Sequence, residues 1–317
     1  MRSSHSTEEA PVRTRCVDTY IASIDPAFVP AVLALDRAVV AVGADYVNDA
    51  IITVRSMDWQ SDMGSNLYAF PRGMQRDGAA GLTSIRWTSR YGSVAAAVFD
   101  LGTADGMNEE GLVVNLLYLA ESEYVTPTTG AKRLPLSISV WTQYVLDNYA
   151  TVAEAVSDLS KEPFYVVPVM MPDGPPGSVH LSISDATGDS AIFEYIGGKL
   201  VIHHDREYQV MTNSPVFEQQ LAINTYRQQI GGTTMLPGTN RAADRFVRAS
   251  FYINAIPKTA DIHEAVAAAF SVIRNVSVPL GISTSGRPNI SSTIWRSVSD
   301  HKNKRYFFES VRSPSLF

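Results

Sequence analysis

The chain contains one thiol, and it contains an arginine and a carboxylate close together at the end of an apolar run. Cys16 is the only cysteine among 317 residues, so by itself it forms no internal disulfide and no zinc or iron–sulfur site. It is either a single-thiol nucleophile or a free cysteine without a function. Arg55 and Asp58 stand three residues apart, where they form either part of a polar site or a salt-bridged strand end.

Two further polar residues stand beside elements that the hydrophobic pattern predicts. Asn213 follows a short apolar run and precedes Pro215, so its amide either serves a site or caps the helix expected from Phe217. Arg245 opens a helical pattern that continues to Ala255. The chemistry indicated at this level is that of one thiol among polar side chains at the ends of apolar runs.

The histidines and glycines form none of the common catalytic or cofactor motifs. Neither HExxH nor GxGxxG, a Walker sequence or G-x-S-x-G occurs in the chain. The adjacent His203 and His204 fall in a predicted strand, where they point to opposite faces and share no metal ion. We therefore predict no metal site and no cofactor. The six histidines are His5, His180, His203, His204, His263 and His301.

The charge pattern argues against nucleic acid and membrane partners. The chain has 26 basic and 32 acidic residues and a net charge of −6, and its one basic tract, 301–305, is interpreted as a solvated turn. The apolar stretch 31–42 is interrupted by Asp36 and Arg37, so no membrane span is predicted. The first ten residues lack the apolar core of a secretory signal. We expect a cytoplasmic protein as written, and a periplasmic one if the true start encodes a signal.

The elements that must position these residues are short strands and paired helices. Helical spacing brings Ile138 and Trp141 to one face, and Thr151 with Glu154 forms a capping box for the second helix of that region. Turn residues at 105–106, 187–188 and 197–198 separate predicted strands. Strands are predicted at 50–54, 94–99, 111–118, 179–184, 190–195, 199–204, 208–212, 294–298 and 305–308, and helices between 134 and 161, at 217–229, at 245–255 and from 261.

This order has no repeating strand–helix–strand rhythm, which argues against a doubly wound parallel sheet. It favours an α+β fold with two antiparallel sheets flanked by helices. No repeat or long linker divides the chain, so a single domain is expected.

Seven sequence blocks follow one another in a consistent order. They are Arg55-Ser56-Met57-Asp58-Trp59, Phe70-Pro71-Arg72-Gly73, Tyr91-Gly92-Ser93, 105–112, Met211-Thr212-Asn213-Ser214-Pro215, Leu236-Pro237-Gly238 and Arg245-Phe246-Val247-Arg248. Together they resemble the choloylglycine hydrolase family, the N-terminal-nucleophile (Ntn) amidohydrolases that include penicillin V acylases and bile salt hydrolases. The resemblance runs from Arg55 to Phe317 and implies a four-layer αββα sandwich. We expect residues 35–317 to form this domain and residues 1–34 to form an N-terminal extension.

The resemblance implies a cysteine-dependent linear amide hydrolase in which an N-terminal cysteine attacks the amide carbonyl and its own α-amine acts as the base. Arg55 would lower the thiol pKa, and Asp58 would orient the α-ammonium. The Asn213 amide and the backbone N–H of Tyr118 would form the oxyanion hole. Arg245 would complete the polar cluster.

The family alignment also implies an apolar acyl pocket. The substrates expected from it are small amides such as penicillin V, an N-acyl homoserine lactone or a conjugated bile salt, and a homotetramer is expected from relatives. Core packing is the alternative interpretation of each pocket residue. These residues are Trp59, Met63, Tyr68, Trp87 and Leu119.

The nucleophile does not align. Relatives carry a cysteine, usually followed by Thr-Arg, one short hairpin before the arginine motif, whereas Cys16 precedes Arg55 by 39 residues (55 − 16). The segment that best fits the family start is Leu35-Asp36-Arg37, which places a leucine at the nucleophile position. Three explanations follow: processing exposes Cys16, the protein is an inactive relative that binds a small amphipathic ligand, or the first forty or so residues are a wrongly started reading of the gene.

Overall fold

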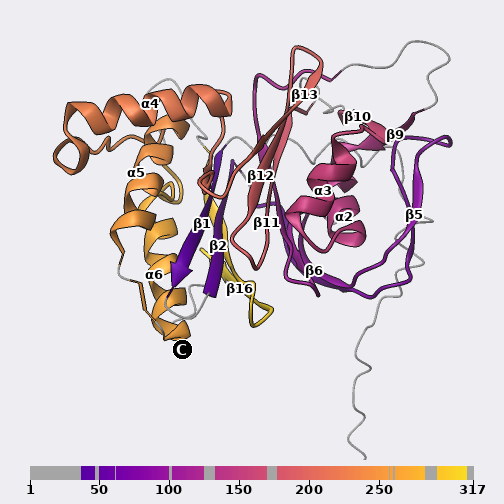
Figure 1. Cartoon of the computed structure of the whole chain (residues 1–317), viewed down its shortest axis with the longest axis horizontal. Helices are drawn as coiled ribbons and strands as arrows, with labels where there is room; N and C mark the ends of the chain where they lie inside the picture. The colour runs from indigo at the N-terminus through magenta and orange to yellow at the C-terminus, as the bar shows by residue number, and fades with distance from the viewer. Residues whose placement is uncertain are drawn as a thin grey trace, which may run out of the picture.

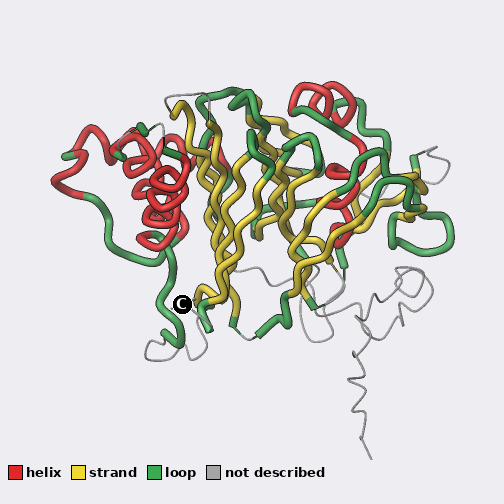
Figure 2. Tube along the Cα trace, turned by 90° about the horizontal axis from the view of Figure 1, so that it is seen from below, coloured by secondary structure: helices red, strands yellow, loops and turns green. Residues whose placement is uncertain are grey.

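Two antiparallel sheets lie face to face, and helices cover both outer sides (Figure 1). The computed structural model describes residues 37–46, 50–60, 62–99, 102–124, 133–169, 177–256, 258–259, 261–282 and 291–312. Cys16 and Leu35 lie outside these residues. Figure 2 shows the same layers from a second direction, with the strands between two groups of helices. The predicted α+β sandwich is confirmed.

The first sheet joins the two ends of the described chain. Its strand order is β14-β1-β2-β15-β16, so β2 lies between the early strand β1 and the late strand β15. Helices α4 (Phe217–Ile230), α5 (Ala242–Ala255) and α6 (Ile262–Asn275) cover its outer face (Figure 1). The strands are β1 (Arg37–Tyr46), β2 (Ala50–Trp59), β14 (Val210–Met211), β15 (Ser292–Asp300) and β16 (Arg305–Ser310).

The second sheet has seven strands in the order β13-β12-β11-β8-β7-β6-β3. Helices α2 (Ile138–Asn148) and α3 (Val152–Leu159) cover it on the side away from the first sheet (Figure 1). Its strands are β3 (Asn66–Phe70), β6 (Ser93–Val98), β7 (Gly102–Asn108), β8 (Val113–Tyr118), β11 (Val179–Ser184), β12 (Ser190–Ile196) and β13 (Lys199–His204). Beside it lie two small sheets, made of β4 (Gln75–Asp77) with β5 (Arg86–Thr88) and of β9 (Leu134–Ser137) with β10 (Phe164–Val167).

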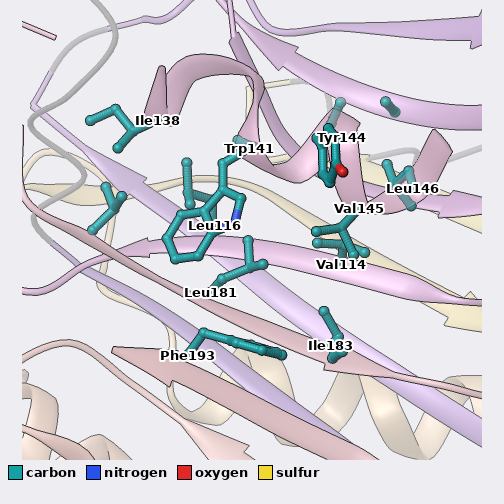
Figure 3. Packing of buried hydrophobic residues seen from close by; sticks show 14 of the residues in the cluster. Val114, Leu116, Ile138, Trp141, Tyr144, Val145, Leu146, Leu181, Ile183 and Phe193 are labelled. Atoms are coloured by element: carbon teal, nitrogen blue, oxygen red, sulfur yellow. The ribbon is translucent and has the colours of Figure 1, made fainter. Parts of the chain in front are cut away.

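The core under α2 is made by the apolar faces that the sequence pattern predicts. Trp141 and Val145 of α2 point toward Leu116, Leu181 and Phe193 on the sheet (Figure 3). These side chains are almost completely buried, and each contributes about 1.5–3 kcal/mol of transfer free energy.

Some predicted limits of helices and strands are correct, and others are wrong because contacts between elements distant in sequence override the local pattern. The N-cap at Thr151 is confirmed, since Glu154 N–H donates to Thr151 Oγ1 at 3.2 Å, while Glu154 Oε2 accepts from the N–H of Ala150, the residue before the cap, at 2.9 Å. The turn expected at 105–106 is instead the middle of β7. A Cβ on Gly106 would lie 2.8 Å from a Leu146 methyl, so this glycine lets α2 approach the sheet.

The basic tract 301–305 forms a turn, but its first residue is not solvated. His301 is completely buried, donates from Nδ1 to the Gly111 carbonyl at 2.7 Å and accepts from the Thr53 hydroxyl at Nε2 at 2.7 Å. Burial lowers the pKa of His301 to about 4, and the Gly111 carbonyl and the carboxylates of Asp185 and Asp300 oppose this only partly. The ring is therefore neutral in the folded protein at neutral pH.

A neutral buried histidine makes stability depend on pH. Because its folded pKa of about 4 lies below the unfolded value of about 6.5, the unfolded chain binds more protons between these values. We predict that His301 alone removes about 3 kcal/mol from the free energy of unfolding as pH falls from 7 to 4. Urea unfolding of wild type and H301Q at several pH values measures this, with the exposed H263Q as control. An equally steep decline in H301Q and wild type would contradict the prediction.

Candidate active site

The predicted polar residues come together where the end of β2, the end of β8, the loop after β14 and the start of α5 meet. Side chains alternate along a strand, so Arg55 and Asp58 leave β2 on opposite faces. Arg55 points toward the seven-stranded sheet, and Asp58 points toward α5. The two side chains therefore face two different layers of the molecule.

Arg245 of α5 connects Asp58 to Asn213. Its Nη1 donates to Asp58 Oδ2 at 3.1 Å, and its Nη2 donates to Asn213 Oδ1 at 3.0 Å. Asn213 Nδ2 donates in turn to the Tyr118 carbonyl at 2.8 Å. Asp58 and Arg245 are completely buried, and Asn213 is 3% exposed. Four of the six predicted catalytic residues thus form one hydrogen-bonded chain.

Arg55 carries a buried positive charge between the sheets. Its guanidinium donates to the carbonyls of Ala104 and Leu116, at 2.5 and 2.9 Å, and lies 5.0 Å from the Trp295 ring centroid. Its Nη1 is 3.9 Å from the carboxylate of Asp105. Burial lowers the pKa of Arg55, although the neighbouring carboxylates oppose this.

The structure excludes the two simpler interpretations of these motifs, which were a salt-bridged strand end at Arg55 and Asp58 and a helix cap at Asn213. The ion partner of Asp58 is Arg245, and that of Arg55 is Asp105, so the motif is more than a salt-bridged strand end. Asn213 is not the cap of α4. The N-cap is Val216, which makes no side-chain capping bond.

The sequence does not single out three further residues of this site, although Asp105 opens one of the family blocks. The Thr293 hydroxyl of β15 donates to the second oxygen of Asp58 at 2.5 Å. Gln220 of α4 donates to the backbone carbonyl of Asn213. Asp105, interpreted as a turn residue, accepts a hydrogen bond from Ser297 and faces Arg55, and burial raises its pKa. Threonine, glutamine and aspartate in such positions are too common to mark a site from sequence alone.

A cavity of about 450 Å³ opens next to this chain of hydrogen bonds. Both Tyr118 and Asn213 line it, so a molecule held there lies against the predicted oxyanion donors. Its other lining residues are Glu121, Ser214, Pro215, Arg241, Ala242 and Ala243.

The predicted acyl-pocket residues do not line that cavity. Trp59, Met63 and Leu119 are buried, and Trp59 packs edge-on against Phe99 with 6.3 Å between ring centroids. Trp87, which is half-buried, donates from Nε1 to Asp147 at 2.7 Å. Tyr68, also half-buried, stacks on Phe70. These contacts are those of ordinary core packing, and a role of these residues in substrate binding stays a prediction.

The entry of the chain into β1 lies beside the site. The first residue of that strand, Arg37, is paired with Asp58. Leu35 stands two positions before Arg37 in the sequence, outside the described residues, as does Cys16. Within the described ranges no group of three His, Cys, Asp or Glu side chains is placed to hold a metal ion. The helices that the structure describes include none long and apolar enough to cross a membrane.

The two stacked antiparallel sheets between helices have the Ntn-hydrolase fold, and sequence comparison specifies the family. The pattern of the linear amide C–N hydrolases, choloylglycine hydrolase family, matches residues 44–316, and the chain belongs to that family.

Solved structures that share this fold include a penicillin V acylase and a bile acid hydrolase. The structure of penicillin V acylase from Agrobacterium tumefaciens is 60% identical, covers 88% of this chain and 84% of its own, and superimposes with a TM-score of 0.78. A conjugated bile acid hydrolase from Clostridium perfringens, solved as a mutant, is 22% identical, covers 86% of this chain and 89% of its own, and has a TM-score of 0.73.

Two curated proteins are similar in sequence. The penicillin V acylase of Pectobacterium atrosepticum is 54% identical over 288 residues, which is 85% of this chain and 76% of that protein. The bile salt hydrolase/transferase of Clostridium perfringens is 26% identical over 261 residues, which is 72% of this chain and 75% of that protein.

The buried Asp58–Arg245 pair predicts a large loss of stability when one partner is removed. R245M leaves the Asp58 charge buried without its guanidinium, and we expect the free energy of unfolding to fall by about 3–5 kcal/mol. The matched control is R312M, which breaks the exposed Arg312–Asp62 pair and should cost less than about 1 kcal/mol. Urea unfolding at pH 7 measures both. Equal losses in the two variants would refute the prediction.

Proposed function

We propose that this protein hydrolyses the linear amide bond of penicillin V or a similar amide with an apolar acyl group, and that Cys16 is its nucleophile. The observation that carries the proposal is the Asp58–Arg245–Asn213–Tyr118 chain beside a cavity of about 450 Å³. The similarity to two penicillin V acylases favours that substrate over a bile salt or an acyl homoserine lactone.

The reaction proposed has two stages. The Cys16 thiol, freed by processing as the N-terminal residue, gives its proton to the α-amine, and the sulfur attacks the amide carbon. The amide C–N bond breaks, the leaving amine takes the proton from the α-ammonium, and the acyl group stays on sulfur as a thioester. A water molecule then attacks the thioester, which releases the carboxylic acid and returns the thiol.

The polar residues supply the electrostatics of these steps. Asp58, fixed by Arg245, would hold the α-ammonium through a charge-assisted hydrogen bond. Arg55 would lie near the thiol as a positive charge and favour the thiolate. The Asn213 amide and the Tyr118 backbone N–H would stabilise the oxyanion that forms during attack on the carbonyl.

A second function is supported by the position of the nucleophile. The family pattern matches from residue 44, and the resemblance predicts Leu35 at the position where relatives carry the cysteine. If Cys16 does not reach the site, the protein binds a small amphipathic ligand in the same cavity without hydrolysing it. The single domain over 35–317, a homotetramer and either cytoplasmic or periplasmic location stay predictions of the same kind.

The nucleophile is tested by intact-mass spectrometry and a cysteine variant. We expect the wild-type chain to begin at Cys16 and to gain the mass of one acyl group after incubation with penicillin V. C16A should lose both the adduct and all hydrolysis, because alanine carries no sulfur. The urea unfolding midpoint serves as the control for folding.

The two functions give different results in this experiment. A chain that begins at Met1, forms no adduct and releases no product, but binds penicillin V in calorimetry, supports the ligand-binding protein. Hydrolysis by C16A at the wild-type rate would exclude Cys16 as the nucleophile.

The oxyanion role of Asn213 predicts a loss in kcat. N213A should lower kcat by about 100- to 1,000-fold with little change in KM, because the amide acts on charge that develops in the transition state. The control is N254A, which removes an exposed asparagine of α5 whose side chain donates to the Ser250 carbonyl. A kcat in N213A within a few-fold of N254A would argue against the assignment.

A further inference from the structure

The loop that carries Asn213 is held by the first turn of α4. Gln220 is 1% exposed, and its Nε2 donates to the backbone carbonyls of Asn213 and Pro215, the latter at 2.6 Å. Its Oε1 accepts from the Thr212 hydroxyl at 2.6 Å. One amide therefore fixes the chain on both sides of Asn213, and the place of Asn213 depends on the place of α4.

The start of α4 is held by a carboxylate from the other sheet. Glu194 of β12 accepts the N–H of Phe217, the first residue of α4, at 3.2 Å from each carboxylate oxygen. The N-cap Val216 offers no side-chain acceptor, so Glu194 satisfies a helix N–H that would otherwise have no partner. A carboxylate at this end of a helix is also favoured by the helix dipole.

Two histidines fix Glu194 within its own sheet. The carboxylate accepts hydrogen bonds from His180 Nδ1 at 3.0 Å and from His203 Nε2 at 3.2 Å. These residues lie on β11 and β13, the two neighbours of β12. Burial raises the pKa of Glu194, but the bonds from both imidazoles and from Phe217 N–H outweigh it and lower the pKa to about 2. The carboxylate is therefore a fixed anion at neutral pH.

We propose that Glu194 and Gln220 are positioning residues for Asn213. Glu194 anchors the start of α4 to the seven-stranded sheet, and Gln220 passes that position to the backbone of Asn213. The inference rests on the proposed function, because it assigns these residues an effect on catalysis. Neither residue lines the cavity, so each acts on the reaction through the loop that carries Asn213.

A catalytic effect distinguishes this proposal from simple stabilisation. Residues that only hold the fold together lower the unfolding midpoint, but the folded molecules keep their normal kcat. Residues that place an oxyanion donor change kcat in molecules that are fully folded, and they leave KM nearly unchanged, because the donor acts on the transition state.

The test compares Q220L with Q219L, its exposed neighbour on α4, and E194A with E194Q. We expect Q220L to lower kcat for penicillin V by about tenfold or more, with KM within about twofold, and Q219L to match wild type. E194Q keeps an acceptor oxygen for Phe217 N–H and should retain more of the wild-type kcat than E194A. All rates are measured below the unfolding midpoint and corrected for the folded fraction.

Hydrogen exchange of residues 212–217 gives a second measurement that needs no turnover. The backbone amides of this segment, which exclude Pro215, should exchange faster in Q220L and E194A than in Q219L and wild type. If the wild-type protein does not hydrolyse penicillin V, the proposed function is refuted. The exchange data alone then decide whether Gln220 and Glu194 position the loop. With active wild type, a normal kcat in Q220L, or equal exchange in Q220L and Q219L, overturns the inference.

Discussion

The buried charge of Arg55 is the constraint on which the stacking of the two sheets depends. An unpaired charge in a protein interior costs several kcal/mol, so the groups that compensate it must be in place whenever the protein is folded. Here they come from the facing sheet, as the Ala104 and Leu116 carbonyls and the carboxylate of Asp105. A shift of one sheet against the other would separate the guanidinium from these partners, and the alignment of the layers is fixed accordingly.

The alternation of side chains along β2 then distributes the site over the layers. Arg55 faces the second sheet, while Asp58, three residues later, faces α5 and meets Arg245. Arg245 reaches Asn213, and Asn213 returns to Tyr118 on the second sheet. The hydrogen bonds therefore run from one sheet through the helical layer to the other sheet. The site is part of the framework of the fold, and α4 with Gln220 extends that framework by one more element.

Local chemistry explains which parts of the fold the sequence predicts. The hairpins between 179 and 204 and the N-cap at Thr151 depend on neighbouring residues, and both are found as predicted. Asp105 and Gly106 have the composition of a turn, yet they lie within β7, because Ser297 binds the carboxylate and α2 packs against the glycine. His301 has the composition of a solvated turn, yet Gly111 and Thr53 bind its ring in the interior. Contacts over such sequence distances have no local signal.

The same reasoning applies to the site. The sequence blocks identify Arg55, Asp58, Asn213 and Arg245, but not which of them contact one another. Arg245 binds Asp58 across 187 positions of sequence. Gln220 lies seven positions after Asn213, in helix α4, and its side chain binds the backbone of the loop that carries Asn213. Of the predicted catalytic residues, Cys16 lies outside the described residues.

The central place of β2 also determines when the site forms during synthesis. This strand is paired with β1 before it and with β15 after it, and Thr293 reaches Asp58 across 235 positions. The ribosome has to complete more than nine tenths of the printed chain before the first sheet acquires β15. Until residues 245 and 293 have been synthesised, Asp58 lacks its partners Arg245 and Thr293. Contacts of such long range slow folding, so a nascent chain carries an incomplete first sheet for most of its translation, and its last strands complete the site.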